Sequence, residues 1–135
     1  MTCSCGSGKD YTECCGPYIE GEASPSTPES LMRSRYTAYT QNNLDYIEKT
    51  MRGEAIERFD RKGGEGVEWI KLDVLFSEEA GDEGTVQFIA RFRCQGEERL
   101  LHETSSFKKV KGKWYYTKGV VSLGQSWVLH HKTIP

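Results

Sequence analysis

The spacing of hydrophobic residues changes from a helical to a strand-like period part way along the chain. In the first half, apolar side chains recur every three or four positions, which places them on one face of an α-helix. Thr27 and Pro28 mark the start of this pattern, because threonine is a favoured N-cap and proline fits the first helical position. The pattern predicts helices at 28–42, 44–51 and 55–61.

The second half alternates between apolar and polar side chains, which is the period of a β-strand with one buried face. The clearest example runs from Val86 to Cys94, where apolar side chains share one parity and arginines occupy the other. This parity predicts that Cys94 is a small core residue. We expect strands at 67–76, 86–94, 99–110, 113–117 and 121–130, separated by turns.

Helices followed by an antiparallel meander are typical of an α+β domain. Ahead of this domain lies a short segment that holds four of the five cysteines. The 135 residues are enough for one ordinary domain and a small appendage. We therefore expect a cysteine-rich segment at 1–22, a small and polar linker at 23–27, and an α+β domain at 28–135.

The clustered cysteines form a Cys-x-Cys pair, Cys3 and Cys5, and an adjacent pair, Cys14 and Cys15. Thiolates are soft ligands, and four of them suit tetrahedral Zn²⁺. The intervening loop is long enough to turn both pairs toward one ion. Disulfides across the loop are an alternative, since a bond within either pair would be strained. Four unpaired thiols in a flexible tail are the third interpretation.

Charge and hydropathy narrow the range of partners. The net charge is −2, and an acidic protein has no general electrostatic attraction for nucleic acid or anionic membranes. No apolar run approaches the about 18 residues that indicate a transmembrane helix, and the first residues carry no signal-peptide pattern. We therefore expect a cytoplasmic protein that contacts neither membrane nor nucleic acid.

The cysteine segment resembles a known zinc motif. Its pattern from Cys3 to Gly16, Cys-x-Cys-Gly-Ser-Gly-x-x-Tyr-x-x-Cys-Cys-Gly, is similar to the SEC-C motif, first named for the C-terminal tail of the SecA translocation ATPase. The resemblance implies that Cys3, Cys5, Cys14 and Cys15 are the structural ligands of one Zn²⁺ per chain. It also implies a protein partner, because the SEC-C module of SecA contacts partners.

The remaining chain resembles the YchJ-like proteins, which join a SEC-C motif to an NTF2-like domain. The similarity covers 28–39, 88–93, 102–107 and 112–116. It implies a cone in which helices pack on a curved antiparallel sheet. The chain departs from the family in two places: its C-terminal end has no second cysteine motif, and Thr50–Gly53 replaces a Thr-Trp-His-Pro-like run.

A pocket inside such a cone would be lined by inward-facing polar and aromatic residues. The candidates are Arg33, Arg35, Tyr36, Trp69, Asp73, His102 and Glu103. Because neighbouring strand residues point to opposite faces, His102 and Glu103 cannot both line the pocket. We predict that Glu103 forms an ion pair with Arg33 or Arg35, since a buried carboxylate requires a partner.

Two functions from different classes remain open, and no catalytic residue is assigned. The first is an adaptor, in which the zinc motif contacts a protein and the NTF2-like domain binds a small ligand or forms a homodimer. The second is a small-molecule enzyme, isomerase-like or hydrolase-like, that uses the cone pocket. The fold hosts both. An unpaired carboxylate or histidine in the pocket would favour the enzyme, and fully satisfied groups would favour the adaptor.

Overall fold

The computed structural model describes residues 2–61 and 66–121, and its main layer is an antiparallel sheet. The strands lie in the order β1-β2-β3-β4 and are β1 (Val67–Ala80), β2 (Glu83–Cys94), β3 (Glu97–Val110) and β4 (Lys113–Val121). Two-residue hairpins connect them. At Gln95-Gly96 and Lys111-Gly112 both turn residues have positive φ, as in the type I′ turns that match the twist of the flanking strands.

The strands extend further than the hydrophobic alternation predicts. β1 continues past Phe76 to Ala80, through residues that are exposed. β4 runs through Val121, so the residue at which a fifth strand was predicted to begin is the end of the fourth. The rest of that prediction, 122–130, lies outside the described residues.

Three helices follow the predicted order, as α2 (Pro28–Thr40), α3 (Leu44–Lys49) and α4 (Glu54–Glu57). α2 begins in a capping box, in which the Thr27 hydroxyl accepts from the Ser30 N–H at 3.0 Å and the Thr27 N–H donates to Ser30 Oγ at 3.1 Å. The segment after α3 is tied to the sheet, because the Tyr116 N–H donates to the Thr50 carbonyl at 2.8 Å.

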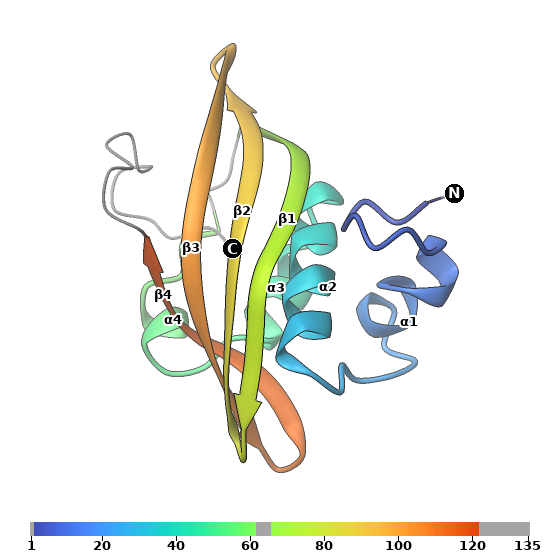
Figure 1. Ribbon diagram of the computed structural model, residues 1–135, viewed down its shortest axis with the longest axis vertical. Helices are drawn as coiled ribbons and strands as arrows, with labels where there is room; N and C mark the ends of the chain where they lie inside the picture. The colour runs from blue at the N-terminus through green and yellow to red at the C-terminus, as the bar shows by residue number, and fades with distance from the viewer. Residues whose placement is uncertain (1, 62–65, 122–135) are drawn as a thin grey trace.

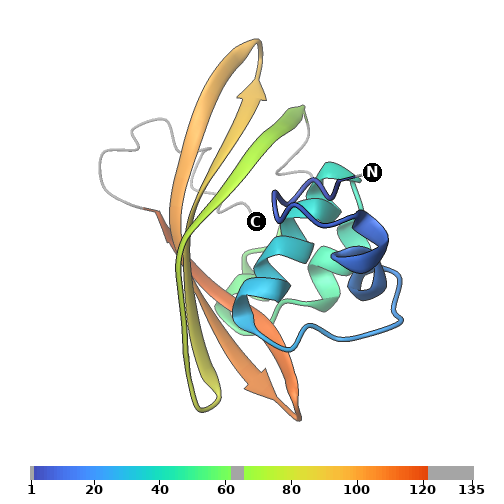
Figure 2. The ribbon, with the colours of Figure 1, turned by 45° about the vertical axis from the view of Figure 1, so that its right-hand side comes forward.

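The helices cover one face of the curved sheet, as Figures 1 and 2 show. The core lies between them, where Phe88, Phe92 and Phe107 of the sheet are buried together with Leu31 and Tyr36 of α2. This is the arrangement predicted for an NTF2-like domain. Within the described ranges, no helix covers the opposite face of the sheet (Figure 2).

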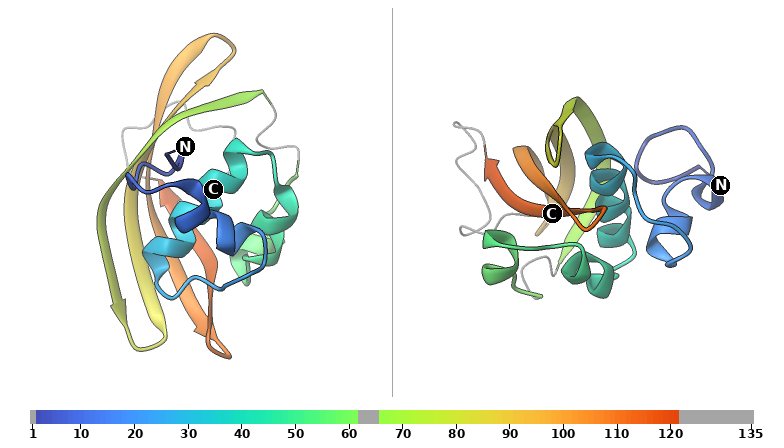
Figure 3. Two further views of the ribbon diagram at one scale, coloured as in Figure 1. Left: turned by 90° about the vertical axis from the view of Figure 1, so that its right-hand side faces the viewer. Right: turned by 90° about the horizontal axis from the view of Figure 1, so that it is seen from below.

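The cysteine segment packs on the side of α2 that faces away from the sheet (Figures 1 and 3). It contains a 3₁₀ turn, η1 (Tyr11–Glu13), and a short helix, α1 (Gly16–Ile19). Neither element was predicted from the sequence, although Pro17 stands in the first turn of α1, a position where proline favours a helix start. The molecule therefore has three layers, with α2 in the middle.

Candidate metal centre and interior polar site

The four N-terminal cysteines come together at one point, where their Sγ atoms all lie within 4.8 Å of one another. The Cys5 and Cys14 sulfurs are 3.6 Å apart, and those of Cys14 and Cys15 are 3.9 Å apart. A tetrahedral ion with Zn–S bonds of about 2.3 Å holds its sulfurs about 3.8 Å from one another. The sulfur positions therefore fit one tetrahedral metal ion. All four are free thiols, so the disulfide alternative is not formed.

Local folding brings the two pairs face to face. The Cys3 N–H donates to the Lys9 carbonyl at 2.8 Å, which closes the intervening loop. Gly6 and Gly8 adopt φ of 82° and 88° in this loop, which glycine does without strain. The second pair lies at the start of α1, whose N-cap is Cys15.

α2 holds the cysteines in place through polar side chains. Thr37 Oγ1 donates to Cys15 Sγ at 3.4 Å and lies 3.6 Å from Cys3 Sγ. Arg33 Nη1 donates to the Cys5 carbonyl at 2.8 Å. Groups that hydrogen-bond to metal ligands orient them and adjust metal affinity. Thr37 was not among the predicted site residues, although it lies four positions after Arg33 and so on the same helix face.

Crowding of the sulfurs changes the acidity of the thiols. A hydrogen bond with Cys15 lowers the pKa of Cys5 to about 4. The same hydrogen bond, together with burial, raises the pKa of Cys15 above its ordinary value, and burial raises that of Cys14. A divalent cation at this point favours the thiolate form of every ligand, because coordination removes the thiol proton.

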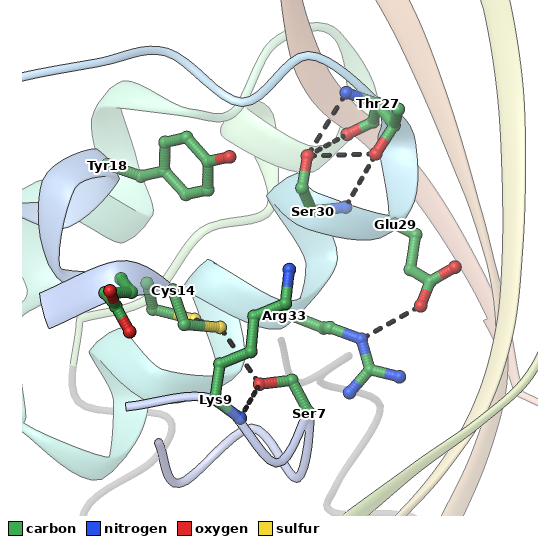
Figure 4. A pocket seen from close by; sticks show the side chains of 10 residues that line it. Ser7, Lys9, Cys14, Tyr18, Thr27, Glu29, Ser30 and Arg33 are labelled. Carbon is green, nitrogen blue, oxygen red and sulfur yellow. Dashed lines mark hydrogen bonds and ion pairs between the residues drawn. The ribbon is translucent and has the colours of Figure 1, made fainter. Parts of the chain in front are cut away.

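A hollow of about 370 Å³ opens beside the cysteines (Figure 4). Cys14 and Cys15 line it, and Cys14 is the half-buried one of the four, whereas Cys3 and Cys5 are buried and do not line it. Lys9 and Tyr18 extend into the hollow, and Arg33 at its wall forms an ion pair with Glu29 at 2.9 Å. The cysteine cluster therefore reaches the surface through Cys14.

A second polar group is buried between α2 and the sheet. Arg35 and Glu103 are both 0% exposed. Glu103 Oε2 accepts from the hydroxyls of Ser105 at 2.7 Å and Tyr116 at 3.0 Å. Burial raises the pKa of Glu103 to about 8, so the neutral acid is favoured near pH 7. Ser105 and Tyr116 were not predicted, although Ser105 shares the strand parity of Glu103.

The predicted ion pair between Glu103 and an arginine is wrong. Arg35 Nη1 donates instead to the Ile47 carbonyl at 2.8 Å and to Thr50 Oγ1 at 2.6 Å. Its Cζ atom lies 4.6 Å from the centre of the Tyr116 ring, and Tyr116 in turn donates to Glu103. Arg33 faces the cysteines. Glu103 thus reaches Arg35 through an intervening tyrosine.

The other predicted pocket residues divide between the two faces of the sheet. Tyr36 and Trp69 face the helices and pack edge to face, with ring centroids 5.8 Å apart. Asp73 and His102 both lie opposite Ile89 on the other face, where Asp73 pairs with Lys71 at 3.6 Å. Their assignment to the pocket is therefore wrong. A register shift between Trp69 and Lys71 reverses the parity of β1, so Trp69 and Asp73 point to opposite faces.

A curved antiparallel sheet with helices on one face, joined to a centre of four cysteines, defines an NTF2-like domain that carries a SEC-C-type motif. The family model for the middle NTF2-like domain of YchJ matches residues 27–119. A UPF0225 protein from Geobacter sulfurreducens is 43% identical over 124 residues, which cover 87% of this chain and 77% of that protein. The chain belongs to the YchJ-like (UPF0225) family.

Solved structures of similar proteins have the same fold as this chain. A SEC-C motif containing protein from Rhodopseudomonas palustris superimposes with a TM-score of 0.84 at 46% identity and covers 90% of this chain and 99% of that one. A SEC-C motif containing protein from Psychrobacter arcticus gives a TM-score of 0.73 at 27% identity, over 90% of this chain and 82% of the other. In the described part of the chain, no helix has the length and apolar character needed to cross a membrane.

Proposed function

We propose that the chain is a zinc-stabilised binding protein, in which Cys3, Cys5, Cys14 and Cys15 hold one structural Zn²⁺. The observation that carries this proposal is the closed set of four sulfurs within 4.8 Å of one another. Catalytic zinc sites keep a coordination position open for water or substrate, whereas four protein thiolates complete the tetrahedron. The ion therefore stabilises the segment at 1–22, and that segment serves as the binding module.

The proposed partner of this module is a protein, as the SEC-C resemblance implies. The hollow beside Cys14, between the module and the start of α2, supports this assignment, because Lys9 presents a cation there and Tyr18 an aromatic hydroxyl. The NTF2-like domain is proposed to bind a small ligand or to pair with a second copy of the chain. A thiolate centre is maintained most easily in the reducing cytoplasm, which is the proposed location.

Metal content tests the zinc assignment. Protein purified under reducing conditions should contain one zinc per chain, and Cys14→Ser should lose most of it. Cys94→Ser is the matched control, since Cys94 lies at the end of β2 and outside the cluster. Wild-type protein without zinc would overturn the proposal, as would equal zinc loss in both variants.

Site-directed crosslinking tests the adaptor role. A photoreactive amino acid at Lys9, in the hollow, should capture a defined protein in living cells. The same amino acid at Glu98, an exposed position of the hairpin between β2 and β3, should not capture it. No adduct at Lys9, or the same adducts at both positions, would contradict a partner site on the module.

One observation favours a second function, that of a small-molecule enzyme. Glu103 Oε1 and two nitrogens of Arg35 are buried without a hydrogen-bond partner, which is unusual for a core that serves only for packing. Small esters and ketones provide a test panel for hydrolase-like and isomerase-like turnover. Activity that disappears in Glu103→Gln would support the enzyme. Activity absent from the wild type, or equal in both proteins, would contradict it.

A further inference from the structure

One edge of the Arg35 guanidinium has no partner. Nη1 is occupied by the Ile47 carbonyl and Thr50 Oγ1, but Nε and Nη2 have no hydrogen-bond partner although both atoms are buried. These two nitrogens form one side of the planar group and point their N–H bonds in parallel. This paired donor matches the two oxygens of a carboxylate. A buried donor without a partner costs free energy, so the arrangement requires an explanation.

Glu103 on β3 also has a buried atom without a partner. Glu103 Oε2 accepts two hydroxyl hydrogen bonds, whereas its Oε1 is buried and has no partner. Because Oε2 accepts hydrogen bonds, the proton of the neutral acid lies on Oε1. The Oε1–H group is then a third donor, in addition to Arg35 Nε and Nη2. Tyr116 connects the two groups, since its hydroxyl binds Glu103 and its ring lies against Arg35.

The backbone of β4 lies very close to the Glu103 carboxyl group. β4 passes so near that a Cβ at Gly119 would collide with the Tyr116 hydroxyl and the Glu103 carboxyl group. Arg35 is likewise fixed from α3 through Ile47 and Thr50. Two polar groups that are held rigidly, while their remaining atoms stay unpaired, have the character of a preorganised binding site.

We propose that Arg35 and Glu103 form an interior binding site for a small monocarboxylate anion. The anion would accept two hydrogen bonds from Arg35 Nε and Nη2 and a third from Glu103 Oε1. This inference rests on the proposed ligand-binding role of the NTF2-like domain and names the class of ligand. It concerns a site separate from the cysteines, because Arg35 lies on the sheet-facing side of α2.

Charge balance supports a single negative charge on the ligand. Of the Lys, Arg, Asp, Glu and His side chains in the described ranges, Arg35 and Glu103 are the fully buried ones. Burial favours the neutral form of Glu103 by raising its pKa, and it raises the pKa of Tyr39 and Tyr46 as well, which keeps these phenols uncharged. Between α2 and the sheet, the guanidinium is then an uncompensated charge, and one bound anion neutralises it.

The direct test follows the Arg35 Nε–H by ¹⁵N NMR in the full-length protein while sodium acetate or sodium formate is added at constant ionic strength. We expect a saturable shift of this resonance with a Kd of about 1 mM or tighter. Sodium chloride is the matched salt control and should not reproduce the shift. No shift with either carboxylate, or an equal shift with chloride, would overturn the proposal and leave a bridging water as the occupant of the site.

Variants separate the roles of the two residues. Arg35→Lys keeps the charge but loses the paired donor, and should weaken acetate binding by about tenfold or more. Glu103→Gln keeps a donor at the Oε1 position and should stay within about threefold of wild type. Arg91→Lys on the outer face is the control. If Arg35→Lys does not fold, the wild-type titration decides alone. Zinc content is measured in each sample, so failure of carboxylate binding is distinguished from failure of the zinc assignment.

Discussion

Arg33 and Arg35 lie close together in sequence but act on opposite sides of α2. Two positions apart on an α-helix correspond to a rotation of about 200°. Arg33 accordingly donates to the Cys5 carbonyl. Arg35 is buried on the side of α2 that faces the sheet, where it lies over the Tyr116 ring. The same rotation explains why treating the two arginines as equivalent partners for Glu103 was wrong, and helical geometry alone could have excluded one of them.

The buried Glu103 predicts a pH-dependent stability. Its pKa is about 8 in the folded chain, against an ordinary value of 4.5. The unfolded chain therefore loses this proton between these two values while the folded chain keeps it. Stability should fall as pH rises through this range, by at most about 1.4 kcal/mol per pH unit.

Urea unfolding of wild type and Glu103→Gln measures this contribution. Gln preserves the shape and the acceptor for Ser105 and Tyr116, so the other titrating groups cancel in the difference between the two proteins. The stability advantage of wild type over the variant should shrink between about pH 5 and about pH 8. A difference that grows over this range would mean that Glu103 is ionised in the folded protein.

Thr37 is predicted to control metal retention. Thr37→Val keeps the shape of the side chain but removes the hydroxyl that lies near Cys3 and Cys15. Loss of such a contact to metal ligands typically lowers affinity by about 10–100-fold. Competition with a zinc chelator measures the change, and Thr85→Val on β2 is the control. Equal zinc affinity in both variants would show that the hydroxyl does not act on the metal centre.

Elements with a strong local signal were predictable, and those that depend on a local irregularity were not. Thr27-Pro28 located the start of α2, and the alternation from Val86 to Cys94 located β2. The bulges of β1 leave no comparable mark, because Ile70 and Leu75 look like ordinary strand residues. The cysteine spacing predicted the cluster itself but not its attachment to Thr37, which depends on how α2 packs.

The close packing of β4 at Gly119 can be tested by mutation. Gly119→Ala should destabilise the fold by about 1–3 kcal/mol, because the added methyl group displaces Tyr116 or Glu103 in a packed interior. The neighbouring Val120 is 54% exposed, and Val120→Ala should change stability by no more than about 0.5 kcal/mol. Urea unfolding compares the two, and equal stability would mean that β4 moves freely at this point.

At the scale of the whole molecule, α2 separates two layers that it binds in different ways. Toward the sheet it presents Leu31, Met32 and Tyr36, which are buried in the core. Toward the cysteine segment it presents Arg33 and Thr37, which hydrogen-bond to the segment, while Ile19 of the segment is buried in the same hydrophobic cluster as the core of the domain. Removing the segment would therefore uncover Arg33 and Thr37, whose polar groups water can solvate.

We accordingly propose that the segment at 1–22 and the domain at 28–135 are thermodynamically separable. A fragment of residues 26–135 should fold alone, and it keeps the Ser26 carbonyl that accepts from the Trp114 indole N–H at 3.2 Å. Removing zinc from the full-length chain should disorder the segment, since a motif this small has little other stabilisation. ¹H–¹⁵N NMR spectra test both statements, and an unfolded fragment would show that the cysteine segment completes the core.

X-ray absorption at the zinc edge tests the central claim most directly, because it reports the ligands of the metal in the intact protein. Four cysteines gathered around one point predict a shell of four sulfurs at about 2.3 Å from zinc. Nitrogen or oxygen atoms in this shell, or fewer than four sulfurs, would contradict a closed structural centre and would indicate an open coordination position.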